Sequence, residues 1–260
     1  MSHHRDRITA CMLGMAVCLC IAVFTALSVM RYDAFHAATF DLGLTAQVMW
    51  NTAYGRVFET SIDRATNAAL IGSYLGNHVQ PILLLLAPFY RLWPDPRLLL
   101  VVQSVALGIA ALPLYEIARR RSGRPTTALV IACCYLAYPA LGFLNLFDFH
   151  VIALSIPLVF LAYWAWQDNR PVWFWIAVLL ALFTKEEMAI PLWMWGLVNL
   201  LRRERRLPSL SLLVLTGVWL VLCVGFIVPF YNEGQPYRFL QLWSYLPGFS
   251  SLPTVQGGLP

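Results

Sequence analysis

The chain has 260 residues, of which 60% are hydrophobic and only 12% carry a charged side chain. Soluble domains average about 45–50% apolar and about 25% charged residues, so this composition excludes an ordinary soluble domain and indicates an integral membrane protein. The net charge of +5 comes from arginines in short loops between apolar runs. That placement is typical of a topology signal and does not indicate a nucleic-acid partner.

The first apolar run, residues 8–29, follows a basic start. It is about 22 residues long, whereas cleavable signal peptides have a core of about 7–15 residues, so we expect a retained signal anchor. Further apolar runs occupy residues 81–93, 98–118, 126–146, 151–166, 172–183, 188–201 and 210–230. Several of the apolar runs approach or exceed the roughly 18 to 20 residues that cross a bilayer as a helix. The sequence therefore predicts an all-α polytopic membrane protein.

Two of these stretches leave alternatives open. Residues 81–93 form only about 20 Å of helix, and they either cross the membrane or lie in its interface. Residues 172–201 form either one long helix or a hairpin broken at Thr184-Lys185-Glu186-Glu187. Positive residues favour the cytoplasmic side of short loops. If 81–93 does not cross and 172–201 is a hairpin, four basic groups all face the cytoplasm: residues 5–7, 119–124, 170 and 202–206.

This arrangement predicts about seven spans, with the N-terminus in the cytoplasm and the C-terminus outside the cell membrane. We expect residues 1–230 to form one transmembrane bundle, with residues 30–97 as an extracytoplasmic loop that carries juxtamembrane helices. Residues 231–260 are expected to form an extracytoplasmic tail. Since no closing span follows them, they also have the appearance of a truncated end.

A surface helix is predicted for residues 40–51. Leu42 and Met49 share one helical face and Gln47 lies on another, which is typical of a helix along the membrane surface. Asp41 stands at the start of this pattern. Two compatible roles are open for it: an N-cap that accepts bonds from the first-turn amides, and a base that points into a cavity.

Two further polar groups stand at predicted membrane boundaries. His78 precedes the run 81–93 and is either a satisfied interfacial residue or a ligand. Asp148 and His150 lie in a short turn between two runs. A polar pair so close to the hydrocarbon is costly unless it faces water or a partner. A helix cap is the alternative role for Asp148.

Lys185 is the only lysine, against seventeen arginines, and it stands in the turn Thr184-Lys185-Glu186-Glu187. The flanking runs give about 18–21 Å of helix each, which is shorter than the roughly 30 Å hydrocarbon core. This predicts an aqueous crevice at the turn. The alternative is a self-neutralising turn that snorkels to the interface. No P-loop, dinucleotide fingerprint, HExxH or Gly-x-Ser-x-Gly motif is present, so nucleotide-driven transport and soluble-type hydrolysis lose support.

These motifs resemble a family of bacterial multi-spanning membrane proteins that is defined as a domain of unknown function. The resemblance covers nearly the whole chain and is carried by an ordered set of motifs: Phe40-Asp41-Leu42-Gly43, His78-x-x-Pro81, Gln103, Leu114-Tyr115-Glu116, Phe147-Asp148-Phe149-His150 with Pro157, and Thr184-Lys185-Glu186. The order of features is also similar to that of the GT-C membrane glycosyltransferases. The chain departs from those enzymes because Leu42 follows Asp41 where an acidic pair is common, and His78 and Gln80 replace a Lys-Pro motif.

The resemblance implies transfer of a sugar from a polyprenyl-phosphate donor to an acceptor on the outer face. Asp41 would be the catalytic base, and Asp148 a second orienting group or ligand. Lys185, with His78 or His150, would bind the lipid phosphate, and Glu186 and Gln47 are further candidate substrate-binding residues. Asp41, Asp148, His78 and His150 also offer mixed ligands for a divalent metal, without diagnostic spacing. The alternatives are a transporter or flippase of a lipid-linked or anionic solute, or an assembly factor without chemistry. The expected partners are a lipid-linked donor and membrane lipids.

Overall fold

The computed structural model describes residues 2–37, 39–61, 72–232 and 237, and most of this part is helical. The chain divides into two compact units. The first unit comprises Met1–Ala46 and Leu92–Ala181, and the second comprises Gln47–Arg91 and Leu182–Pro260. Most of the predicted extracytoplasmic tail, and residues 62–71 of the predicted outer loop, lie outside the described residues.

Within the residues that the structure describes, four helices are long and apolar enough to cross a membrane: Asp6–Asp33, Arg97–Ser122, Pro125–Leu146 and Arg206–Tyr231. Shorter apolar helices occupy Leu83–Leu92, Val151–Gln167 and Pro171–Leu182. The prediction of an all-α membrane protein is therefore confirmed. These elements coincide with the apolar runs because lipid offers no hydrogen-bond partners. The backbone amides and carbonyls of an apolar run must therefore bond to one another within a helix.

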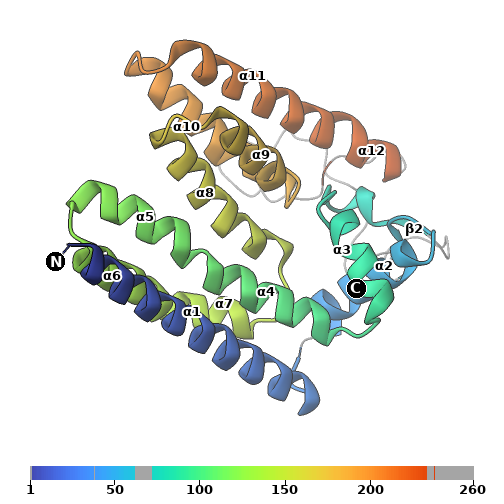
Figure 1. Cartoon of the computed structure of the whole chain (residues 1–260). Coiled ribbons are helices and arrows are strands. Elements are labelled where there is room, and N and C mark those ends of the chain that lie inside the picture. The colour runs from blue at the N-terminus through green and yellow to red at the C-terminus, as the bar shows by residue number, and fades with distance from the viewer. Residues whose placement is uncertain (1, 38, 62–71, 233–236, 238–260) are drawn as a thin grey trace, which may run out of the picture. The chain divides into compact units, whose positions relative to one another are not determined.

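The first unit is built around α1 (Ser2–Asp33), which lies alongside α4 (Arg97–Ile109) and α6 (Pro125–Leu136) (Figure 1). The remaining helices are α5 (Ala111–Ser122), α7 (Pro139–Leu146), the 3-10 turn η2 (Val151–Leu154), α8 (Ser155–Gln167) and α9 (Pro171–Leu182). Its core places Leu13 and Val17 of α1 against alanines of α5 and α6. Small side chains let helix backbones approach closely in a membrane protein, where packing drives association.

Proline divides two runs that the sequence predicts as continuous. Residues 98–118 divide into α4 and α5 at Ala110, and Pro113 lies three residues into α5. Residues 126–146 divide into α6 and α7, where Pro139 is the first residue of α7. Proline lacks an amide hydrogen and its ring clashes with the preceding turn, so it is best accommodated near a helix start.

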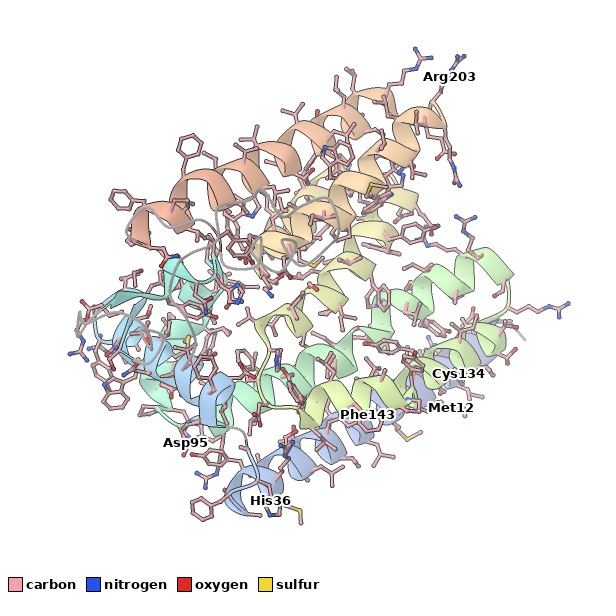
Figure 2. The ribbon with its side chains drawn as sticks, turned by 180° about the vertical axis from the view of Figure 1, so that it is seen from behind. Met12, His36, Asp95, Cys134, Phe143 and Arg203 are labelled. Atoms are coloured by element: carbon pink, nitrogen blue, oxygen red, sulfur yellow. The ribbon has the colours of Figure 1, made fainter. Side chains whose placement is uncertain are left out.

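The second unit places α10 (Ala189–Leu201) beside α11 (Arg206–Leu222) (Figure 1). Their connecting turn is rich in exposed arginine and includes Arg203, which Figure 2 labels. The unit also contains α3 (Leu83–Leu92), the antiparallel pair β1 (Glu59–Thr60) and β2 (Gly72–Ser73), the 3-10 turns η1 (Tyr74–Gly76) and η3 (Glu186–Met188), a π-helical turn (Cys223–Ile227) and α12 (Val228–Tyr231). Since α9 and α10 are separate helices, the predicted break near Thr184 is confirmed, and residues 172–201 do not form one long helix.

Large apolar side chains are exposed along the long helices. Met12 of α1 and Phe143 of α7, both labelled in Figure 2, are examples, and the labelled Cys134 of α6 is also exposed. Water would oppose such a surface, whereas lipid chains accept it. The exposed apolar surface therefore agrees with a membrane environment for the helices.

Gly108 provides a test of helix packing in the first unit, because a Cβ atom added there would lie 2.3 Å from Cγ1 of Ile21 on α1. We predict that Gly108→Ala lowers the free energy of unfolding by about 1–3 kcal/mol, since it overpacks the contact between α1 and α4. The control is Gly142→Ala, because nothing lies within 4 Å of a Cβ atom there. Unfolding of both variants in mixed micelles measures the effect, and equal stability of the two variants would contradict the packing.

Candidate functional site

Asp41 lies in the first turn of α2 (Thr39–Ala53), which confirms the predicted helix. The helix begins two residues before Asp41, so the N-cap interpretation is wrong in position. A carboxylate inside the first turn is still stabilised by the positive end of the helix dipole. Its side chain is 40% exposed, so it is accessible to another molecule.

The turn that carries Asp148 and His150 is held by Gln103 of α4. Nε2 of Gln103 donates to the main-chain oxygen of Asp148 at 2.7 Å, and its Oε1 accepts from the main-chain amide of His150 at 2.7 Å. Gln103 is fully buried. Asp148 itself is buried and has a φ of 83°, which is a strained conformation for a residue other than glycine. The bidentate amide offsets that strain and fixes the direction of the turn.

A second buried amide anchors the start of the same turn. Nδ2 of Asn145 donates to the hydroxyl of Ser28 at 2.6 Å and to the main-chain oxygen of Phe24 at 2.9 Å. Its Oδ1 accepts from the hydroxyl of Ser104 at 2.9 Å. Every polar atom of the Asn145 side chain therefore has a partner, and the turn is tied to α1 and α4.

The first unit brings two of the predicted site residues together. Nε2 of His150 lies 3.9 Å from Oδ2 of Asp41, and both side chains are partly exposed. The ring of His150 also stacks on Phe147 at a centroid distance of 5.3 Å. At this distance the two groups do not form a hydrogen bond, but an imidazole beside an accessible carboxylate can stabilise its negative charge. This arrangement suits a general base.

Gln47 lies in the second unit and binds the strand that follows α2. Its Oε1 accepts from the hydroxyl of Thr60 at 2.8 Å and from the amide of Ser61 at 3.0 Å. Its Nε2 donates to the hydroxyl of Ser61 at 2.8 Å. These bonds give Gln47 a structural role in connecting α2 to β1, and its predicted contact with substrate stays a prediction.

The second unit contains a buried carboxylate, Glu186, in the 3-10 turn η3. Its Oε1 lies 2.8 Å from Nδ1 of His78 and also accepts the hydroxyl of Tyr237. Its Oε2 accepts the main-chain amide of Val79 at 2.9 Å. The side chain is fully buried, whereas that of His78 is 13% exposed. Two of the predicted binding residues, 108 positions apart in the sequence, therefore form one pair.

Electrostatics determine the protonation of this cluster. Burial raises the pKa of Glu186. The hydrogen bond and charge of His78 and the hydroxyl of Tyr237 together lower that pKa by more, so it lies below its ordinary value. Burial, together with the neighbouring Glu186 carboxylate, raises the pKa of Tyr237, which keeps its proton and donates it. An ionised carboxylate accepts only, so Nδ1 of His78 carries a proton whether the ring is neutral or cationic. The other ring nitrogen, Nε2, then changes from acceptor to donor when the ring is protonated.

The surroundings hold the His78 ring in place. Tyr74 and Tyr237 contact it edge-on at centroid distances of 6.1 and 6.4 Å. The hydroxyl of Tyr74 donates to Oε1 of Gln80 at 3.0 Å. A Cβ atom on Gly76 would lie 2.9 Å from the main-chain oxygen of Tyr231, so only glycine permits this approach of η1 to α12. The site is therefore rigid before any ligand binds.

A π-helical turn forms one wall of the same cluster. Cys223 and Val228 pack with Val79 and Tyr237 in a buried apolar group. One-turn π-helices are rare in proteins overall, and many of those that occur lie at functional sites. Here the extra residue per turn lies where α11 continues toward α12, beside the residues that bury Glu186.

Lys185 precedes the buried carboxylate. Its Nζ lies 3.1 Å from Oε2 of Glu187, and its side chain is 18% exposed. The pair confirms that the lysine and an acid of the turn neutralise each other, as one of the two alternatives predicted. A long flexible ammonium paired with an exposed acid can exchange that partner for an anionic ligand.

The structure therefore distributes the predicted site residues over two clusters. The first unit holds Asp41, Asp148 and His150, and the second unit holds His78, Lys185 and Glu186 with Gln47. In the part of the chain that the structure describes, no group of three or more His, Cys, Asp and Glu side chains is arranged to hold a metal ion.

Three residues hold these clusters together although sequence motifs give little or no indication of that role. Asn145 and Tyr237 have no motif around them. Gln103 enters only through the family resemblance. A buried amide in an apolar run is the one available signal for Asn145 and Gln103, because such groups must find partners within the bundle. No comparable signal identifies Tyr237 within the polar tail.

Comparison with known proteins gives one family match. Residues 31–258 match the family described as "Predicted membrane protein (DUF2079)". No curated protein matches the chain significantly. No solved structure matches it significantly either.

Glu186 provides a test of the second-unit cluster. We predict that Glu186→Gln costs about 3–5 kcal/mol of unfolding free energy at pH 7, because it removes the charged partner of a buried pair. Glu187→Gln, at a 38% exposed side chain, should cost at most about 1 kcal/mol.

The pH dependence has a definite sign. Since the pKa of Glu186 is lowered in the folded protein, its ionised form contributes stability above the ordinary glutamate pKa of about 4.3. That contribution disappears as the pH falls through the lowered pKa, so wild-type and Glu186→Gln stabilities should converge in acid. Unfolding measured from pH 7 to pH 3 tests this, and a difference that stays constant would contradict it.

Proposed function

The chain belongs to the DUF2079 family of predicted membrane proteins, and from this premise we propose that it is a GT-C-like membrane glycosyltransferase. The reaction is the transfer of a sugar from a polyprenyl-phosphate donor to an acceptor on the outer face of the membrane. The main support is the Glu186–His78 pair, in which a buried carboxylate that directly follows the only lysine in the sequence orients an imidazole.

The chemistry requires two kinds of group. The acceptor oxygen attacks the anomeric carbon while the bond from that carbon to the phosphate oxygen breaks. The acceptor proton passes to a carboxylate, and the polyprenyl phosphate leaves with the bonding electrons. A base must therefore lie near the acceptor, and positive charge must lie near the phosphate.

The second unit supplies the phosphate-binding groups. His78 is held by its Nδ1–H and can donate from Nε2 when protonated, which suits a phosphate oxygen. Lys185 can exchange Glu187 for the more strongly charged phosphate. Because Glu186 already fixes the imidazole, binding costs little conformational entropy.

The first unit supplies the base. Asp41 is accessible, and its charge is supported by the first turn of α2 and by His150 at 3.9 Å. Gln103 fixes the His150 backbone, which keeps the imidazole beside the Asp41 carboxylate, where its positive form would stabilise the negative charge. Asp148 supports the same turn and serves as the second orienting residue.

The proposed topology has seven spans. In addition to the four long helices, the three remaining spans are α8 with its preceding turn, α9 and α10. In this topology α3 lies in the interface. The segment Val151–Gln167 reaches about 25 Å as a helix, close to the thickness of the hydrocarbon core. Arginine clusters then lie in the cytoplasm and the acidic turns lie outside.

A flippase remains the second candidate, because α9 and α10 are short helices separated by a charged turn. Discontinuous helices of this kind bind ions and anionic substrates in transporters. The two functions differ in product. A transferase consumes the lipid-linked donor, whereas a flippase moves it unchanged between leaflets. Reconstituted vesicles with radiolabelled polyprenyl-phosphate sugars distinguish them.

We predict that Asp41→Asn lowers kcat for sugar transfer by at least about 100-fold, because the amide cannot accept the acceptor proton. Glu116→Gln is the control, since Glu116 is a similarly exposed carboxylate of the first unit that pairs with Arg119. Transfer by purified protein in vesicles measures both. Full activity of Asp41→Asn would remove Asp41 from the role of base.

We predict that Lys185→Met raises KM for the donor by about 10- to 100-fold, because an ammonium contact with phosphate is lost. Lys185→Arg should recover part of the loss, since it keeps the charge. Donor titrations with all three proteins give KM. An unchanged KM in Lys185→Met would contradict phosphate binding by this residue.

A further inference from the structure

A cluster of arginines at one end of α5 and α8 takes no part in the proposed reaction. The cluster consists of Arg120 and Arg121 at the end of α5, Arg124 after it, and Arg170 between α8 and α9. All four are exposed. Topology accounts for their charge, but it requires no particular arrangement of their side chains.

The arrangement is nevertheless specific. Asp168 binds two guanidinium groups at once: Oδ1 accepts from Arg120, and Oδ2 accepts from Arg170 at 2.5 Å. Both groups also lie over the ring of Trp164, at 5.9 and 5.3 Å from its centre. Aspartate and indole therefore hold two long side chains in fixed positions.

The charge of this array is not balanced. Two arginines share one carboxylate, which leaves one positive charge. Arg121 donates to the neutral hydroxyl of Tyr163 at 3.1 Å and adds a second. Arg124 adds a third. Planar guanidinium groups match phosphate oxygens in pairs, so a preorganised array of this kind suits a phosphate group.

The surroundings indicate the source of that phosphate. Immediately after Arg170, Val172 and Trp173 of α9 are 67% and 51% exposed. Ile176, one helical turn further on, is 42% exposed. A soluble phosphate makes no contact with an adjacent apolar face, whereas the acyl chains of a phospholipid would cover that face.

We propose that Arg120 and Arg170, organised by Asp168 and Trp164, bind the headgroup of an anionic phospholipid together with Arg121 and Arg124, and that the acyl chains of this lipid lie along α9. The site lies within the first unit and is independent of the transferase reaction. Asp168 is a positioning residue in it: it orients guanidinium groups and does not touch the lipid phosphate.

The experiment uses the purified full chain in detergent, with phosphatidylglycerol and phosphatidylcholine as probes and native mass spectrometry as the readout. We expect phosphatidylglycerol to bind about tenfold more tightly than phosphatidylcholine. The double variant Arg120→Gln/Arg170→Gln should lose that preference. The control, Arg203→Gln/Arg206→Gln, removes the same charge from the turn between α10 and α11 and should keep it.

Asp168→Asn separates an organised site from simple attraction. The substitution makes the cluster more positive, so attraction by charge alone predicts equal or tighter binding. An organised site predicts weaker binding, by about threefold or more, because the two guanidinium groups lose their anchor. Size-exclusion and unfolding profiles of this variant, matched to wild type, show that the fold is kept.

Several outcomes would overturn the proposal. They are equal binding of the two lipids, equal loss in the control double variant, or unchanged or tighter binding by Asp168→Asn. Displacement of phosphatidylglycerol by millimolar inorganic phosphate would also overturn it, since the site would then be one for soluble phosphate. Sugar transfer is measured separately, so failure here leaves the transferase proposal standing.

Discussion

The second unit depends on one constraint: the fully buried carboxylate of Glu186 must be compensated on every side. The consecutive residues His78 and Val79, through an imidazole and a main-chain amide, and the distant Tyr237 supply that compensation from two separate segments. An uncompensated charge in an apolar interior would cost several kcal/mol, so these segments are held where the charge needs them. The same bonds fix one imidazole with a defined proton at Nδ1. Stability and proposed function therefore rest on the same contacts.

In the first unit, buried uncharged side chains play the part that the Glu186 carboxylate plays in the second. Gln103 and Asn145 are amides inside apolar helices, and each satisfies both its donor and its acceptor atoms across the bundle. They hold the turn of Asp148 and His150, including a backbone conformation that would otherwise be strained. Uncharged amides therefore make the buried polar contacts around this turn, whereas the carboxylate of Asp41 is accessible.

Much of the helical architecture follows from the sequence, because long apolar runs have few alternatives in a membrane. The charged turn at Thr184 to Glu187 and the helix at Asp41 were also predictable from composition and spacing. The pairing of His78 with Glu186 was not, because it joins residues 108 positions apart and depends on tertiary packing. The helix breaks near Pro113 and Pro139 were within reach of the sequence, since proline at those positions removes a helical hydrogen bond.

The central claim is that Glu186 presents the His78 imidazole to a lipid phosphate. Nitrogen-15 spectra of the full chain labelled at histidine test it most directly, with the His78 signals assigned by their loss in His78→Gln. The account predicts a protonated Nδ1 before ligand is added, and a shift of the Nε2 signal on addition of polyprenyl phosphate. Unchanged His78 signals while the lipid phosphate demonstrably binds would contradict the claim.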